Sequence, residues 1–340
     1  MATAKFQIGY WVASTEKPFP PQNDPIPFFT HLYYAFLQVQ AETGELIIPV
    51  ELEQDMNTFV QCVHDKQKKA IVSIGGTKPN NSKSDDPSIA ISTMAKSAAK
   101  RSKFIESTFA FAKNYGFDGL ELAWVYPKTK NDMRNLTNLF SEWKASNTEK
   151  KLLSAAVYCQ PNIPNDSNQE IKYPAELDKH IDILNIILYN YCPVTCQHSQ
   201  FNPSNPGPVN SSKLAIDLWS EARISKYKLV MGIPLYGGKW ILADEKDTSI
   251  GAPVEGYLGR VAYRDIPDPE AGKFDDKVTK CMYKAENEGD RAVWYGYEAT
   301  PSVMEKVEYA KKNLGGYFLY SIGYDDDDFT LCSAAAEQMG

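Results

Sequence analysis

Eight short apolar runs alternate with helix-like segments along the chain, and this alternation constrains the fold more than any other feature. Most of the runs have the length of a strand and are rich in Val, Ile, Leu and Tyr, which is typical of strands buried on both faces. The runs are Phe6–Trp11, His31–Val39, Ala70–Gly76, Gly119–Val125, Leu152–Cys159, Asp182–Tyr191, Lys228–Gly237 and Gly316–Tyr324. This order predicts an α/β fold, a closed (β/α)8 TIM barrel. A doubly wound open sheet is the alternative that the pattern leaves open.

The segments between the runs carry apolar residues at helical spacing. The predicted helices are Arg101–Asn114, Asp132–Lys144, Ser211–Arg223, Ser302–Asn313 and Ser333–Met339. The first of them is expected to stop before Gly116, because glycine commonly ends a helix. Thr300 followed by Pro301 predicts a helix cap and a first-turn proline at the start of the fourth.

One interval, from Gly238 to Thr300, is too long for an ordinary loop and is rich in Gly, Asp and Tyr. We interpret it as a small α+β lobe inserted between the seventh strand and the last helix pair. The predicted division is therefore a barrel of residues 1–237 and 301–340 and a lobe of residues 238–300. Since the loops at the carboxyl ends of the strands build the site in such barrels, the lobe is expected to wall one side of the cleft.

Charge and composition exclude several classes of function. The 36 basic and 43 acidic residues give a net charge of −7, which disfavours nucleic acid as a partner. No run approaches 18 apolar residues, so no membrane span is expected. The sequence predicts no metal site and no cofactor, and the chain is expected to be a monomer that binds an oligosaccharide or a small molecule.

The compartment stays open at this point. The beginning of the sequence has no apolar stretch of signal-peptide length, which predicts a cytoplasmic protein if the chain is complete and an extracellular or vacuolar one if a leader was removed. Cys192 and Cys196 are close enough in sequence to form a disulfide, and reduced packing cysteines are the alternative.

Several segments together point to a family. Residues Tyr115–Pro127 resemble a fourth-strand signature D-G-x-D-x-D-x-E, and the order of the remaining segments matches the other strands of the same family. Those segments are Phe29–Phe36, Ser73–Gly76, Leu188–Tyr191, Met231–Gly237 and Gly316–Ile322, followed by Asp325–Asp328. The chain thus resembles glycoside hydrolase family 18, and most of all the plant class V chitinases, which carry a similar insertion after the seventh strand. In that family similar acidic runs cap the last helix.

The fourth strand carries the chemistry of the family this chain resembles. Alternate side chains of a barrel strand point inward, about 6.6 Å apart, so Glu121, Ala123 and Val125 are expected to face the barrel and Leu122 and Trp124 the helices. In the family these inward positions hold Asp, Asp and Glu. The last of them protonates the glycosidic oxygen, and the middle one orients the N-acetyl group of the sugar, whose oxygen attacks the anomeric carbon. Ala123 and Val125 can do neither, which predicts a degenerate catalytic motif and no chitin hydrolysis.

Three further positions depart from the resemblance around the cleft. The sixth-strand Asp of the family is Asn190, the arginine that often follows Tyr-Gly on the seventh strand is Gly238, and the eighth-strand tryptophan is Tyr320. We therefore expect a chitinase-like lectin that binds a glycan in the barrel cleft without cleaving it. The predicted ligand-binding residues are Tyr10, Phe36, Ala123, Val125, Asn190, Tyr236 and Tyr320.

Two alternatives remain open. The chain could be an enzyme of plant specialised metabolism, a cyclase, isomerase or condensing enzyme that acts on a small hydrophobic substrate with Glu121 and Tyr189 as acid and base. If Glu121 has only a structural role, it is a buried carboxylate hydrogen-bonded to Tyr189 or to another hydroxyl. The other alternative is an inhibitor of foreign hydrolases that uses rim loops such as Cys192–Pro208.

Overall fold

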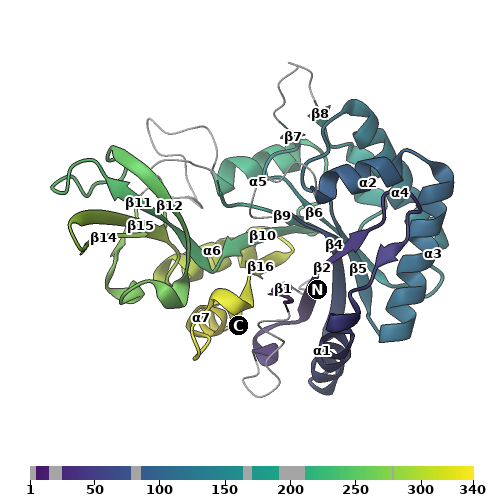
Figure 1. Cartoon of the computed structure of the whole chain (residues 1–340), viewed down its shortest axis with the longest axis horizontal. Coiled ribbons are helices and arrows are strands. Elements are labelled where there is room, and N and C mark those ends of the chain that lie inside the picture. Colours follow the sequence, from purple (N-terminus) through teal and green to yellow (C-terminus); the bar gives the residue numbers. More distant parts are fainter. Residues whose placement is uncertain (1–4, 15–24, 78–85, 164–170, 191–210, 278) are drawn as a thin grey trace.

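Eight parallel strands close into a barrel in the computed structural model of the chain (Figure 1), which describes residues 5–14, 25–77, 86–163, 171–190, 211–277 and 279–340. The strands of the barrel are β1 (Phe6–Val12), β2 (His31–Val39), β4 (Lys69–Gly75), β5 (Gly119–Ala123), β6 (Leu152–Val157), β9 (Ile183–Ile186), β10 (Leu229–Pro234) and β16 (Gly316–Tyr320). Each pairs with the next in this order, and β16 pairs back onto β1. The predicted (β/α)8 barrel is therefore confirmed, and the open sheet is wrong.

Helices cover the outside of the barrel, with α1, α3 and α4 on the right in Figure 1. The helices are α1 (Glu53–Asp65), α2 (Pro87–Ala95), α3 (Ala98–Tyr115), α4 (Lys130–Ser146), α5 (Ser212–Glu221), α6 (Thr300–Asn313) and α7 (Thr330–Met339). Short pieces complete the barrel layer: β3 (Leu46–Ile47), β7 (Asn162–Ile163), β8 (Ile171–Lys172) and the 3-10 turns η1 (Ile26–Phe28), η2 (Val50–Leu52), η4 (Ala175–Lys179) and η7 (Ile322–Tyr324). None of the described helices is long and apolar enough to cross a membrane.

The two faces of β5 separate two hydrophobic clusters, as the alternation of a strand requires. Leu120, Leu122 and Trp124 belong to the large cluster between the strands and the helices. Glu121 points the other way, into the barrel, where it is fully buried beside the inner cluster that contains Tyr10 and Tyr189. The predicted orientation of the fourth strand is therefore confirmed.

Local capping explains where the helices begin and end. Gly116 follows α3 with a φ of +83°, a left-handed conformation that glycine adopts without steric cost. The carboxylates of Asp325 and Asp326 accept hydrogen bonds from backbone N–H groups of α7, as the resemblance implied. The cap predicted at Thr300 is wrong. Residue 299 takes the cap position, and the backbone N–H and hydroxyl of Thr300 bind Glu270 instead.

The predicted lobe region forms a five-stranded antiparallel sheet, coloured green on the left of Figure 1. Its strands are β11 (Tyr236–Leu242), β12 (Val254–Ala262), β13 (Lys273–Phe274), β14 (Met282–Glu288) and β15 (Arg291–Tyr297). Apart from Val278, which the structure does not describe, residues 238–299 contain strands and the 3-10 turns η5 (Tyr263–Asp265) and η6 (Pro269–Ala271) but no α-helix. Proline in several of its turns, such as Pro253, Pro267 and Pro269, disfavours helix interiors there. The division of the chain at 238 and 300 stays a prediction.

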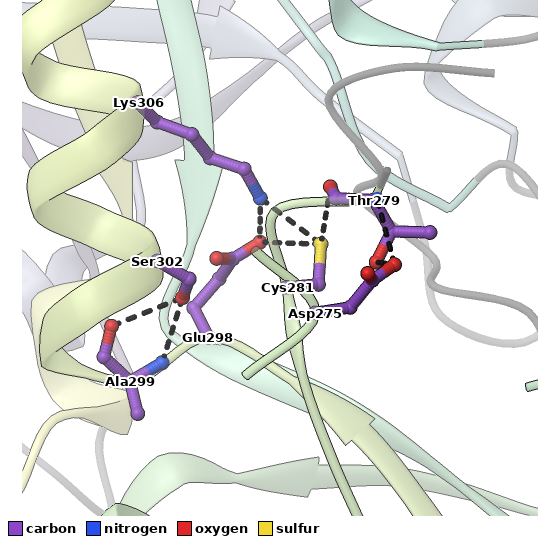
Figure 2. A network of polar contacts seen from close by, with 7 residues as sticks. All are labelled: Asp275, Thr279, Cys281, Glu298, Ala299, Ser302 and Lys306. Carbon is purple, nitrogen blue, oxygen red and sulfur yellow. Dashed lines mark hydrogen bonds and ion pairs between the residues drawn. The ribbon is translucent and has the colours of Figure 1, made fainter. Parts of the chain in front are cut away.

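A buried polar cluster lies where the lobe sheet runs into α6 (Figure 2). The Lys306 ammonium of α6 forms an ion pair with Glu298, which follows β15, and lies 3.2 Å from the Cys281 sulfur, which precedes β14. All three side chains are buried. Removal of one partner of such a buried ion pair strongly destabilises the fold, because the other charge stays buried without a counter-ion.

We predict that Lys306→Met lowers the free energy of unfolding by about 3–5 kcal/mol, as expected for breaking a buried ion pair. The measurement is urea denaturation followed by circular dichroism. Lys312→Met is the matched control on the same helix, because Lys312 pairs with Glu308 on the surface; there a loss below about 1 kcal/mol is expected. Equal losses in the two variants would contradict the prediction.

Candidate functional site

A cavity of about 160 Å³ opens at the carboxyl ends of the barrel strands. Among its walls are Val12 at the end of β1, Ala123 at the end of β5 and Tyr320 at the end of β16. This is the face on which barrels of this type build their sites. The volume lies below the range of about 300–1,000 Å³ typical of pockets that enclose a drug-sized ligand. The cavity therefore suits a small molecule or one unit of a longer ligand.

The structure brings all seven residues predicted to bind a ligand to this cavity, together with Tyr189. Those seven are Tyr10, Phe36, Ala123, Val125, Asn190, Tyr236 and Tyr320. Their convergence follows from the barrel, since each lies in the carboxyl-terminal half of a barrel strand or shortly beyond its end. That they bind a ligand stays a prediction.

Tyrosine rings form much of the cavity wall. Tyr320 stacks on Tyr189 with ring centroids 6.0 Å apart, and the Tyr236 ring meets Tyr189 edge-on at 6.0 Å. Burial raises the pKa of Tyr189 and of Tyr236 well above the usual value for a phenol. The hydroxyls therefore stay protonated at neutral pH and can donate hydrogen bonds to a ligand.

Some of these polar groups have no partner within the described residues. The Tyr236 hydroxyl donates to the Asn190 carboxamide oxygen at 2.9 Å. The hydroxyls of Tyr189 and Tyr320 make no hydrogen bond within the described part of the chain, and neither does the Asn190 amide nitrogen. A bound ligand can form hydrogen bonds with polar groups that face a cavity and have no partner in the described protein.

Glu121 lies beneath the cavity and does not line it. Its carboxylate accepts hydrogen bonds from the Tyr10 hydroxyl at 2.7 Å, the Ser73 hydroxyl at 2.5 Å and the Asn185 amide at 2.7 Å. Burial raises its pKa, although the same three hydrogen bonds favour the ionised form and oppose that rise. The carboxylate is thus held by hydroxyls of β1 and β4 and an amide of β9, and its hydrogen-bond partners do not include Tyr189.

The cavity wall above Glu121 is apolar. Ala123 and Val125, which follow it on the same face of the fourth strand, line the cavity and are almost fully buried. Among the described lining residues there is no Asp or Glu. The described residues also contain no group of three or more His, Cys, Asp or Glu side chains that could hold a metal ion.

Arg260 is the lining residue that sequence reasoning missed. It lies on β12 of the lobe, paired in register with Gly238 of β11, and its guanidinium carbon is 5.0 Å from the centre of the Tyr236 ring. A side chain at 238 has no room, since a Cβ there would lie 2.1 Å from the Trp240 ring. The arginine that the resemblance places at 238 is therefore absent, and the neighbouring strand supplies another. Only the expectation that the lobe walls the cleft pointed towards it.

Within the described residues, Cys62, Cys159, Cys281 and Cys332 form no disulfide. The possible pair Cys192–Cys196, like the rim loop Cys192–Pro208, lies outside the residues that the structure describes. These segments add nothing to the site as described.

Comparison with known proteins now decides the family. The model of "Glycosyl hydrolases family 18" matches residues 7–325. The chain belongs to glycosyl hydrolase family 18. This family 18 protein is 31% identical to a class V chitinase of Lotus japonicus over 98% of the chain and 86% of that relative.

Solved structures share the whole fold of this family 18 protein. A mutant of the class V chitinase of Nicotiana tobaccum, solved in complex with NAG4, is 29% identical, and the match covers 99% of both chains with a TM-score of 0.86. A chitinase-like agglutinin of Robinia pseudoacacia is 30% identical, covers 98% of this chain and 99% of its own, and has a TM-score of 0.85. Hence both a chitinase and an agglutinin have the architecture described above.

The raised pKa of Glu121 predicts how the stability of the protein depends on pH. Because burial raises its pKa, the folded protein holds this proton more tightly than the unfolded chain does. Its contribution to stability is therefore present below the unfolded pKa of about 4.3 and is lost as the pH rises through the folded pKa. Glu121→Gln, which does not titrate, is expected to gain thermal stability relative to the natural protein as the pH rises from about 4 to about 8. Melting temperatures across that range test this.

Glu106→Gln is the control for this measurement, since Glu106 is exposed on α3. Its melting temperature should follow that of the natural protein at every pH. A difference between Glu121→Gln and the natural protein that is constant with pH, or that falls as the pH rises, would contradict the raised pKa.

Proposed function

We propose that this family 18 protein is a chitinase-like lectin that binds a glycan at the mouth of the barrel and does not hydrolyse it. The observation that carries the proposal is the composition of the cavity. Its described wall combines tyrosines, Asn190, Arg260 and apolar side chains, with Ala123 and Val125 in place of the carboxylates that the resemblance implies, and it holds no Asp or Glu.

The described wall of the cavity has no group that could protonate the glycosidic oxygen. A general acid has to lie within about 2.6–3.2 Å of the oxygen that it protonates, and its loss typically costs about 10²–10⁴ in rate. Tyr189 and its neighbours are too weakly acidic for that role, because burial raises the pKa of their hydroxyls. The carboxyl group of Glu121 lies below the cavity and is engaged by three hydrogen bonds.

Binding, by contrast, is supported by what the cavity retains. Aromatic rings offer flat apolar surfaces, and the hydroxyls of Tyr189 and Tyr320 and the amide of Asn190 can hydrogen-bond to a sugar. The similar tobacco protein was solved with NAG4, and the similar Robinia protein is an agglutinin. These likenesses support a glycan rather than an unrelated small molecule as the ligand.

The alternative of a repurposed enzyme has less support. It needs Glu121 and Tyr189 to exchange protons with a substrate, yet Glu121 does not line the cavity. It also needs Tyr189 to ionise, which the raised pKa of this phenol opposes. The apolar wall of Ala123 and Val125 fits a small hydrophobic substrate, but in the described residues it faces no acid and base pair.

We predict that chito-oligosaccharides bind without being cleaved. Isothermal titration calorimetry is expected to give a saturable heat, while an assay for reducing ends gives no release above the buffer blank. The tobacco class V chitinase serves as the positive control of the assay. Release of reducing ends by the purified protein would overturn the non-hydrolytic part of the proposal, and absence of binding to a panel of neutral and charged glycans would overturn the binding part.

Tyr189→Phe tests the site itself. Removing this hydroxyl is expected to weaken glycan binding about tenfold, the equivalent of one hydrogen bond worth about 1.4 kcal/mol. Tyr227→Phe is the matched control, because Tyr227 is exposed and precedes β10, at the end of the barrel opposite the cavity. Equal affinities of Tyr189→Phe and Tyr227→Phe would remove Tyr189 from the binding site.

A further inference from the structure

Arg260 is the one charged side chain among the described residues that line the cavity. It reaches the cavity from β12 of the lobe, whereas most of the wall comes from the barrel. The sequence resemblance assigns no role to this position. The contacts of Arg260 in the structure therefore have to show what its charge does.

No acidic group neutralises Arg260 within the described part of the chain. It forms no ion pair and no hydrogen bond there, and its contact is with the face of the Tyr236 ring. A guanidinium commonly stacks on an aromatic ring while its N–H groups stay free to bind an anion. The guanidinium of Arg260 lies over the Tyr236 ring, and no described residue engages its N–H donors.

The tyrosines around Arg260 do not neutralise it either. Its charge favours the ionised forms of Tyr189, Tyr236 and Tyr320, but burial outweighs this and raises the pKa of all three, so the rings stay neutral. Burial alone would lower the pKa of Arg260, and the surrounding tyrosines outweigh that effect, so its pKa is raised. The cavity therefore carries a fixed positive charge at every physiological pH.

The geometry of the lobe fixes where this charge lies. β11 and β12 pair with Gly238 opposite Arg260, and the Trp240 ring occupies the space that a side chain at 238 would need. Arg260 consequently projects from the second strand of the pair towards Tyr236 at the start of the first. The cation thus depends on the pairing of the two lobe strands and lies within reach of the Tyr320 and Tyr324 rings that line the same cavity.

We propose that the glycan bound here carries an anionic group, a uronate carboxylate or a sulfate ester, which Arg260 binds. This inference rests on the proposed function. Arg260 offers a fork of N–H donors that matches a carboxylate or sulfate, and charge-assisted bonds of this kind are about twice as strong as neutral ones. The free hydroxyls of Tyr189 and Tyr320 add neutral donors, and no carboxylate in the described wall repels the anion.

Calorimetry with three probes tests the inference: a neutral N-acetylglucosamine oligomer, an oligomer of alternating N-acetylglucosamine and glucuronate, and a sulfated N-acetylglucosamine oligomer. At least one acidic probe is expected to bind about tenfold or more tightly than the neutral one, since hydrogen bonds to charged groups exceed neutral ones by about that factor. Added salt should weaken binding of the acidic probe and leave that of the neutral probe almost unchanged. The two acidic arms distinguish a uronate from a sulfate.

Arg260→Gln and Arg260→Lys identify the residue responsible. Arg260→Gln is expected to abolish the preference for the acidic probe, because it weakens binding of the acidic probe more than binding of the neutral one. Arg260→Lys keeps the charge but loses the planar fork, so part of the preference should remain. Arg291→Gln is the matched control, because Arg291 at the start of β15 is exposed, as Arg260 is, but does not line the cavity. Melting temperatures show whether each variant is folded.

The outcomes separate this inference from the proposed function. Equal affinities for the neutral and acidic probes, unchanged in Arg260→Gln, would overturn the inference and leave the glycan-binding function in place. An equal loss of affinity for all probes in Arg260→Gln would also overturn it, because Arg260 would then only position Tyr236 and the lobe. Absence of binding to every probe would overturn the proposed function, and the inference with it.

Discussion

A single buried carboxylate joins four strands of the barrel, and much of the site follows from how it is held. Glu121 of β5 accepts hydrogen bonds from Tyr10 of β1, Ser73 of β4 and Asn185 of β9. A carboxylate in an apolar interior is costly unless its lone pairs are satisfied. The network meets that demand and fixes Tyr10 between the barrel interior and the cavity that it lines. The remaining acid of the fourth strand is consequently occupied inside the scaffold, and the cavity above it is left without one.

The inward face of each strand and the place where each strand ends depend on local sequence patterns, and these features could be predicted. Alternation along the fourth strand placed Glu121, Ala123 and Val125 on the inner face, and the closed barrel places them one above another. Strand ends also predicted which tyrosines converge, since parallel strands of a barrel present their carboxyl ends on one face. The exact hydrogen-bond partners of Glu121 could not be predicted, because Tyr10 and Asn185 lie 111 and 64 residues away.

Arg260 shows why the rest of the site escaped prediction. Its place depends on the register of β11 and β12, and that pairing shifts between Lys239 and Trp240 and again between Ile241 and Leu242. A shift of one residue turns a side chain to the other face of a sheet, so the composition of the lobe alone does not tell which residues face the barrel. The missed cap at Thr300 has a similar origin, since Glu270 of the lobe binds its hydroxyl and backbone N–H.

The charge of the cavity bears on both parts of the proposed function, binding without hydrolysis and the choice of ligand. Hydrolysis of a glycosidic bond passes through a transition state that resembles an oxocarbenium ion, and in the mechanism of the family a carboxylic acid protonates the glycosidic oxygen while the N-acetyl oxygen of the sugar attacks. The described wall of the cavity offers neutral phenols and one arginine but no carboxylic acid, so it has no group that could supply this proton. The positive charge of Arg260 lowers the energy of a bound anion instead. An acid-free described wall and a cation on the lobe therefore both favour the proposed function, a protein that binds an acidic glycan without cleaving it.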